Sequence, residues 1–141
     1  MKITPALLKR LPKVELHCHL DGSLRVPTII DLAEKQRVEL PSHNLDRLTK
    51  MLTIGKKRGT LEDYLEKFEI TLSVLQTPES LIRTARELAE DAAAENVRYM
   101  EIRYSPILHT AMGMTPQESV VAVRKGLMQG EKEFGIKSRI I

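Results

Sequence analysis

Aromatic residues and cysteine are scarce in this sequence. The 141 residues include no Trp, two Phe, three Tyr and a single cysteine, Cys18. So few aromatic rings leave little surface on which nucleobases could stack. The 22 basic and 19 acidic residues give a net charge of +3, and they alternate in sign along the chain. We therefore expect no nucleic-acid partner. One cysteine excludes an internal disulfide and fits a reducing compartment.

Long apolar runs are also missing. No stretch approaches the ~20 apolar residues that a membrane-spanning helix needs. The segment Met1 to Leu11 has basic residues but neither an apolar core nor a small-residue cleavage site. We therefore expect no signal peptide, no membrane partner and a cytoplasmic location.

What the chain does contain is an alternation of strand and helix patterns. Residues 13–19 alternate between apolar and polar, which is typical of a strand. Apolar stripes at helical spacing, with Thr, Pro, Asn and Gly at their ends, predict helices between the strands. This order predicts a parallel α/β sheet. The expected helices are 5–11, 27–36, 45–52, 60–75, 78–95 and 116–134, and the expected strands are 13–19, 97–104 and 136–141.

The last residues continue a strand pattern up to Ile141 without a turn or a polar tail. Three parallel strands alone would leave open edges and uncovered faces. The expectation is that residues 1–141 are one fragment of a larger domain, cut within the third strand.

The strongest chemical signal is His17-Cys18-His19 at the end of the first expected strand. Side chains alternate across a strand, so both imidazoles point one way and Cys18 points the other. Two neutral imidazoles on one face suit a zinc ion. The alternative is a chance pair facing solvent or core. The metal interpretation is favoured because the pair stands at a strand end, directly before Asp21 and Gly22.

Three segments carry a resemblance to a known family: residues 11–24, LPKVELHCHLDGSL, residues 60–68 and residues 97–106. The first is similar to the signature that opens the adenosine deaminases, the second resembles their lid helix, and the third resembles their second strand. The resemblance covers essentially the whole chain and about two-fifths of a typical member. It implies the N-terminal portion of a (β/α)₈ TIM barrel, with about two and a half βα units and extra helices after the first strand.

The resemblance also implies roles for individual residues. His17 and His19 would bind the zinc ion, one per complete active site, and His19 would also contact substrate. Asp21 would accept a hydrogen bond from a ribose hydroxyl; without the resemblance, a cap of the following helix is the simpler interpretation. Four apolar residues would form a lid or pocket wall, although such a stripe also suits core packing: Leu61, Tyr64, Leu65 and Phe68.

For the full-length protein, the resemblance implies hydrolytic removal of the 6-amino group of adenosine or 2′-deoxyadenosine, a small-molecule purine nucleoside substrate. We expect a monomer or a weak homo-oligomer. The acid glutamate and the base histidine are expected beyond Ile141, so no catalytic residue lies within this chain, which alone should be inactive. The alternatives are deamination of adenine, an AMP-type or a modified nucleoside, another His-x-His amidohydrolase, or a non-catalytic fragment acting through association.

Two further expectations concern single side chains. Glu15 or Glu101 is expected to pair with Arg103 below the metal, because a buried charge needs a partner. His43 and His109 both fall in predicted loops, and we expect both to be solvated; the alternative for His109 is that it lines the rim of the pocket.

Overall fold

The computed structural model describes residues 2–53 and 61–141, and the side chains of that range except those at 61–64 and 66. Within it, no helix is long and apolar enough to cross a membrane. The elements are α1 (Pro5–Arg10), β1 (Lys13–His19), α2 (Val26–Gln36), α3 (Leu45–Leu52), α4 (Leu61–Ser73), α5 (Pro78–Ala94), β2 (Val97–Arg103), the 3₁₀ helix η1 (Pro106–His109), α6 (Pro116–Phe134) and β3 (Lys137–Ile140).

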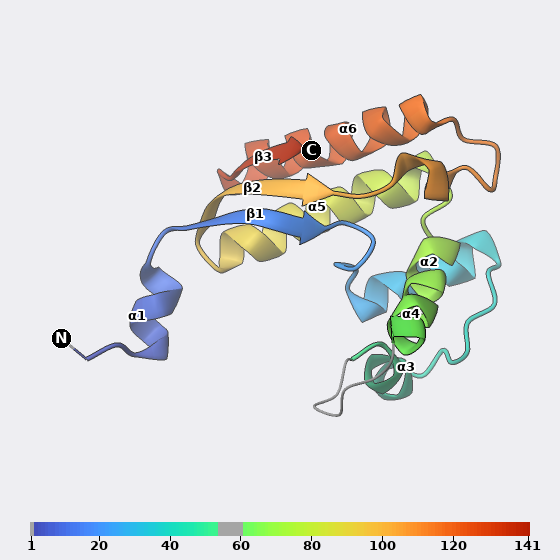
Figure 1. Ribbon diagram of the computed structural model, residues 1–141, viewed down its shortest axis with the longest axis horizontal. Helices are drawn as coiled ribbons and strands as arrows, with labels where there is room; N and C mark the ends of the chain where they lie inside the picture. Colours follow the sequence, from blue (N-terminus) through green and yellow to red (C-terminus); the bar gives the residue numbers. More distant parts are fainter. Residues whose placement is uncertain (1, 54–60) are drawn as a thin grey trace.

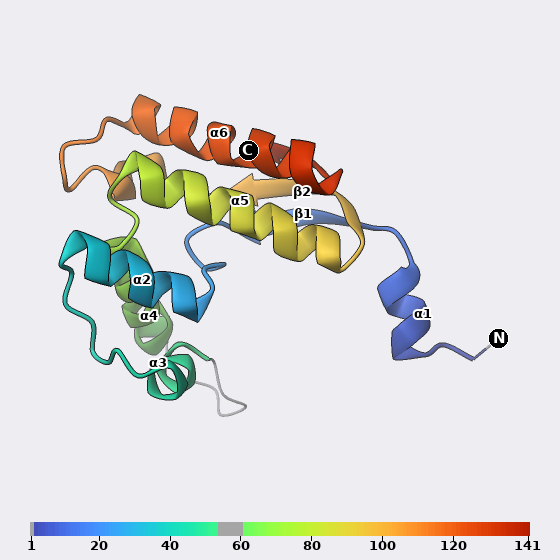
Figure 2. The same cartoon turned by 180° about the vertical axis from the view of Figure 1, so that it is seen from behind.

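The three strands form one parallel sheet in the order β1-β2-β3, which confirms the predicted α/β class. Helices α5 and α6 lie side by side over one face of the sheet (Figures 1 and 2). Helices α2, α3 and α4 gather beyond the end toward which β1 runs (Figure 1). The carboxyl ends of the strands are where reactive side chains collect in parallel α/β folds. The fold therefore places three helices beside that end.

Two apolar cores hold these layers. One lies between the sheet and α5 and α6, around Met100, Ile102 and Leu127. The other joins α2, α3 and α4 around Ile29 and Leu48. Polar contacts link the two cores, since α2 and its N-cap Arg25 bind side chains of α5. Arg25 pairs with Glu90 and Asp91, Thr28 with Glu87, and Asp31 with Arg83.

Most helix ends follow the capping chemistry that the sequence indicates. Thr4 accepts a hydrogen bond from the Leu7 N–H at the start of α1, and Thr77 caps α5 in the same way. Asn96, just past α5, and Gly135, at the end of α6, adopt left-handed conformations with φ of 65° and 69°. The predicted start of α4 at Thr60 lies outside the described residues.

The capping box of α6 makes a testable contribution to stability. Thr115 accepts from the Glu118 N–H, and the Glu118 carboxylate accepts from the Thr115 N–H at 2.8 Å. Replacing Thr115 by Ala should lower the free energy of unfolding by about 1 kcal/mol in urea titrations. The Thr115 backbone and hydroxyl donors lower the pKa of Glu118 below its ordinary value of 4.5.

A lowered folded-state pKa stabilises the fold fully above the unfolded pKa, and this contribution disappears as the pH falls through the folded value. The difference in stability between the wild type and Glu118→Gln should therefore shrink below about pH 4.5. If the difference in unfolding free energy between the two proteins stays constant with pH, the ionised Glu118 carboxylate does not stabilise the start of α6 in this way.

The pairing of β1 with β2 departs from the simple alternation that the sequence predicts. Glu15 pairs with Met100 and Cys18 with Ile102, so β1 holds one more residue than β2 in this interval. Such a bulge re-aims the side chains around it.

The expected ion pair of Arg103 with Glu15 or Glu101 is not formed within the described residues, and this prediction was wrong. Glu15 Oε1 accepts from the His17 N–H at 3.0 Å, and Glu101 Oε1 accepts from the Tyr99 hydroxyl at 2.9 Å. Both carboxylates thus bond to near neighbours on their own strands.

Candidate metal and substrate site

The rings of His17 and His19 lie on the same side of β1. Their Nε2 atoms are 3.2 Å apart, and their ring centroids are 5.2 Å apart. Two nitrogens bound to one tetrahedral zinc at 2.0–2.1 Å would be separated by about 3.3 Å. The observed spacing fits two imidazoles that share one metal ion through Nε2.

Local structure around the pair fixes the end of β1. His19 pairs with Arg103 across the sheet, and the Leu20 N–H donates to the Arg103 carbonyl oxygen at 2.9 Å. Ser23 donates its hydroxyl to the His19 carbonyl, closing the turn after the strand. Cys18 lies on the opposite side of β1 and packs against the core under the helices, as the alternation of side chains along a strand predicts.

The pair supplies only part of a coordination shell. Across residues 2–53 and 61–141, no three or more His, Cys, Asp or Glu side chains come together as a metal-binding group. A catalytic zinc site usually has three protein ligands, so at least one more ligand would have to come from elsewhere.

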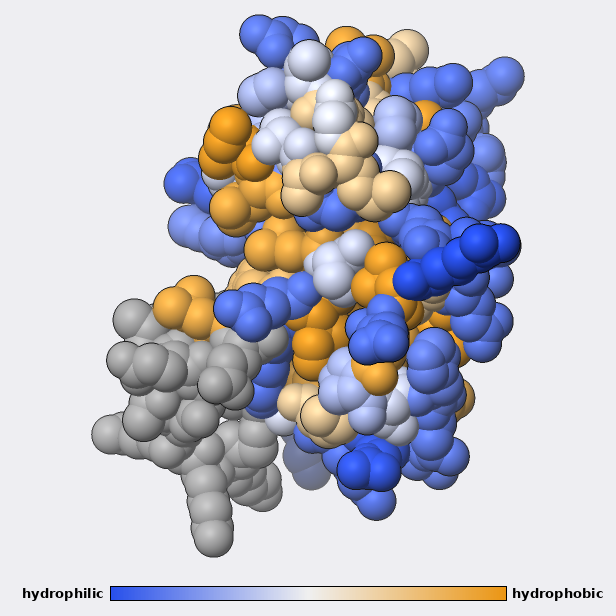
Figure 3. Space-filling view, turned by 90° about the vertical axis from the view of Figure 1, so that its right-hand side faces the viewer, coloured by the Kyte–Doolittle hydropathy of each residue, from blue (hydrophilic) through white to orange (hydrophobic). Residues whose placement is uncertain are grey.

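The end of the molecule toward which the strands run has an apolar surface. Figure 3 looks onto this end, where apolar side chains form a band across the middle.

Asp21 follows directly in the turn after β1 and is 5% exposed. Its Oδ1 atom is 3.8 Å from Nδ1 of His19 and has no hydrogen-bond partner among the described residues. The N-cap of α2 is Arg25, so Asp21 does not cap that helix. The interpretation of Asp21 as a helix cap is therefore not supported.

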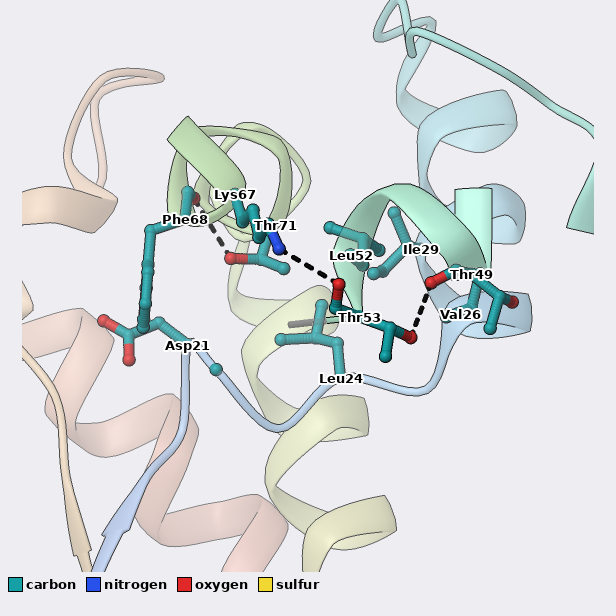
Figure 4. A pocket seen from close by; sticks show the side chains of 11 residues that line it. Asp21, Leu24, Val26, Ile29, Thr49, Leu52, Thr53, Lys67, Phe68 and Thr71 are labelled. Carbon is teal, nitrogen blue, oxygen red and sulfur yellow. Dashed lines mark hydrogen bonds between the residues drawn. The ribbon is translucent and has the colours of Figure 1, made fainter. Parts of the chain in front are cut away.

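A cavity of about 280 Å³ opens beside Asp21, between α2, α3 and α4. Figure 4 shows Phe68 reaching from α4 down to Asp21. The Phe68 ring lies against Gly22, where an added Cβ would come within 3.3 Å of it. Lys67 on the same helix donates to the Thr53 carbonyl at 3.1 Å.

The four expected lid residues are not all placed alike. Phe68 lines the cavity wall. Leu65, on the same helix, is 53% exposed. The side chains of Leu61 and Tyr64 lie outside the described residues.

His109 departs most from expectation. It was predicted to be solvated, but it is completely buried at the end of η1, whereas His43 is exposed as expected. Its Nδ1 atom is 2.9 Å from the Leu75 carbonyl oxygen, and its ring lies 5.5 Å from that of Tyr104. Burial lowers the pKa of His109, so the ring is neutral near pH 7. The sequence holds no signal for this, because Leu75 is 34 residues away.

Comparison with known proteins is consistent with these features. The family model described as Adenosine deaminase matches residues 12–141. The adenosine deaminase of Clostridium perfringens (strain SM101 / Type A) is 49% identical over 134 residues, which are 95% of this chain and 40% of that protein.

Two solved structures have a similar fold. An amidohydrolase from Burkholderia ambifaria, solved with bound Zn, has a TM-score of 0.84 at 32% identity, covering 100% of this chain and 38% of that one. Adenine deaminase from Arthrobacter aurescens has a TM-score of 0.80 at 31% identity, covering 92% of this chain and 38% of that one.

The chain thus spans about 40% of the length of the relatives that it matches. It corresponds to the N-terminal portion of their TIM barrels, as its three parallel strands and their helices indicate. The family match extends over most of the sequence and includes both histidines and Asp21. This chain belongs to the adenosine deaminase family.

Proposed function

We propose that the full-length protein is a zinc-dependent hydrolase that deaminates adenosine and 2′-deoxyadenosine, releasing inosine or 2′-deoxyinosine and ammonia. Residues 1–141 then form the N-terminal fragment of its single barrel domain, ending within the third strand. The observation that carries the proposal is the 3.2 Å separation of the His17 and His19 Nε2 atoms at the end of β1. The fragment alone, with two ligands, is not expected to turn over substrate.

His17 and His19 would hold the metal through Nε2, which requires both rings to be neutral. When bound, zinc lowers the pKa of a coordinated water to about 7 and makes it nucleophilic. The zinc in the Burkholderia ambifaria amidohydrolase supports this choice of metal. The remaining ligand, the acid glutamate and the base histidine would come from strands that follow Ile141.

His19 and Asp21 would together bind a ribose hydroxyl. An oxygen atom can lie at about 2.8 Å from both His19 Nδ1 and Asp21 Oδ1, because these two atoms are 3.8 Å apart. The hydroxyl would accept from the Nδ1–H group and donate to the carboxylate. The same tautomer leaves Nε2 of His19 unprotonated for the metal, so the two roles of this ring are compatible.

Adenine and AMP are less suited to this arrangement. Adenine has no hydroxyl to donate to Asp21, so a buried carboxylate would stay unpartnered. A phosphate beside the same carboxylate would be repelled. The relative that is named adenine deaminase makes this alternative worth testing. A panel of adenosine, 2′-deoxyadenosine, adenine and AMP, assayed on the full-length protein, decides between them; a preference for adenine or AMP would overturn the proposal.

Asp21 gives a selective prediction. Asp21→Ala in the full-length protein should lower kcat/KM for adenosine by about 10- to 100-fold, since a hydrogen bond to a charged group contributes about 1.5–3 kcal/mol. One of the 2′-, 3′- or 5′-deoxyadenosines should be affected by no more than about twofold, because it lacks the hydroxyl that Asp21 binds. Equal losses for all four substrates would contradict this role.

A further inference from the structure

The junction between α4 and α5 is where the two apolar cores meet. Val74 is completely buried in the core of α2, α3 and α4, and its neighbour Leu75 is completely buried in the core between the sheet and α5 and α6. Backbone carbonyls in such a buried turn are costly to leave unpaired. Two buried polar side chains, Gln76 and His109, bind carbonyls at this junction and join it to the loop after β2.

Gln76 makes three hydrogen bonds and is only 8% exposed. Its Nε2 atom donates to the Leu72 carbonyl at 2.8 Å and to the Leu108 carbonyl at 3.0 Å. Its Oε1 atom accepts from the Ala111 N–H at 3.0 Å. Leu72 lies in the last turn of α4, whereas the other two partners lie in and just after η1, 32 and 35 residues along the chain from Gln76. One side chain therefore fastens the end of α4 to the loop after β2.

His109 adds a second bond between the same two segments. Its side chain is completely buried, and its Nδ1 atom lies 2.9 Å from the Leu75 carbonyl oxygen. A carbonyl oxygen only accepts, so Nδ1 carries the proton and donates it. The ring of Tyr104, just past the end of β2, lies 5.5 Å from the imidazole and limits its rotation. The end of α4 is thus held to η1 by buried bonds from two side chains, and breaking either bond leaves buried polar groups unpaired.

The position of α4 matters because this helix carries Phe68 to the proposed substrate site. The Phe68 ring lies against Gly22, whose added Cβ would be 3.3 Å from the ring, and it lines the cavity beside Asp21. Phe68 stands one turn before Leu72 on the same helix. Successive turns of a helix are bonded to each other, so a shift of the last turn moves Phe68 relative to the Asp21 turn.

We propose that Gln76 and His109 are positioning residues for the proposed substrate site: by fastening α4 to η1, they set the distance of Phe68 from the turn that carries Asp21. The Phe68 ring then forms one apolar wall of the nucleoside site. This inference rests on the proposed function, because it assumes that a nucleoside binds beside Asp21. A wall that contacts substrate and transition state equally affects KM and leaves kcat unchanged.

The test uses the zinc-loaded, full-length enzyme with adenosine as substrate. Gln76→Met keeps the length of the side chain and removes all three hydrogen bonds. It should raise KM by about tenfold, since a small misplacement of a positioning group has a large effect, while kcat and zinc content stay within about twofold. The dissociation constant of inosine, measured by calorimetry, should rise by the same factor as KM.

His109→Leu tests the same link from the side of η1, and it serves if Gln76→Met does not fold. The substitution removes the bond to the Leu75 carbonyl and leaves an apolar side chain in the buried position. It should also raise KM, by at least about threefold, with kcat again within about twofold of the wild type.

Gln36→Met is the matched control. Gln36 also donates its amide nitrogen to a carbonyl of this junction, that of Val74 at 2.8 Å. This bond stays within the group of α2, α3 and α4 and does not reach η1. Gln36→Met should therefore lower the melting temperature and leave KM within about twofold of the wild type.

A double-mutant cycle with Phe68→Ala separates positioning from stability. Phe68→Ala should raise KM by about as much as Gln76→Met, and in that background Gln76→Met should raise it no further, because both act through one ring. Gln76→Met and His109→Leu that lower the melting temperature with unchanged KM would show a purely structural role and overturn the inference. Multiplying effects of Gln76→Met and Phe68→Ala on KM overturn it as well.

The wild-type enzyme distinguishes failure of this inference from failure of the proposed function. If the zinc-loaded wild type does not deaminate adenosine, the proposed function fails and the inference falls with it. If the wild type deaminates adenosine and KM is unchanged in Gln76→Met and His109→Leu, the proposed function stands and only the inference falls.

Discussion

Replacing Gly126 by Ala in the full-length protein is expected to lower the free energy of unfolding by about 3 kcal/mol, in the upper range for overpacking a filled interior. Gly126 lies on α6 where this helix packs against α5. A Cβ at this position would be 2.2 Å from the Ile82 carbonyl oxygen and 2.9 Å from the Ala85 Cβ. The backbone oxygen cannot move away alone, so the two helices would have to separate.

The sign of this effect makes it informative. In an exposed helix interior, Gly→Ala stabilises by about 1 kcal/mol because alanine has the higher helix propensity. Gly130→Ala should destabilise like Gly126→Ala, since its Cβ would be 2.3 Å from the Ala89 Cβ. Lys125→Ala, on an exposed position of the same helix, is the matched control and should be nearly neutral. Urea unfolding measures all three, and a stabilising Gly126→Ala would show that α5 and α6 are not packed this closely.

The second large effect concerns the metal. His17→Ala in the full-length protein should lower kcat for adenosine by at least about a thousandfold, because a metal ion contributes several kcal/mol to transition-state stabilisation. Zinc bound per protein molecule, measured by plasma mass spectrometry after dialysis, should fall from about one toward zero. His19→Ala should behave in the same way, since both Nε2 atoms would bind the same ion.

His43→Ala is the control for both histidine variants. His43 is exposed in the irregular segment before α3, 24 residues after His19 in the sequence. Removal of its imidazole should leave zinc content and kcat within about twofold of the wild type. Full zinc content in His17→Ala together with wild-type turnover would exclude this histidine from the metal site.

Much of the fold follows from local patterns. The bounds of α3 and α6 agree with the expected ranges, because Asn44 and Thr115 cap the helices from one turn away. The alternation of residues 13–19 also predicts the strand that carries both histidines, and it correctly places their rings on one side. These are interactions between residues close in sequence.

The features that sequence reasoning missed depend on distant residues. The bulge between Glu15 and Cys18 arises from the pairing of β1 with β2, more than 80 residues away in the sequence. Burial of His109 depends on the Leu75 carbonyl at the junction of α4 and α5. Neither neighbour can be inferred from the local pattern, because tertiary contacts decide both.

The most direct test of whether His17 and His19 bind one zinc ion is an anomalous-scattering map at the zinc absorption edge. The map would be recorded from crystals of the zinc-loaded, full-length protein. It should show a single peak within about 2.0–2.1 Å of Nε2 on both imidazoles, together with further ligands from the rest of the barrel. A zinc ion bound elsewhere, with His17 and His19 turned away from it, would contradict the assignment.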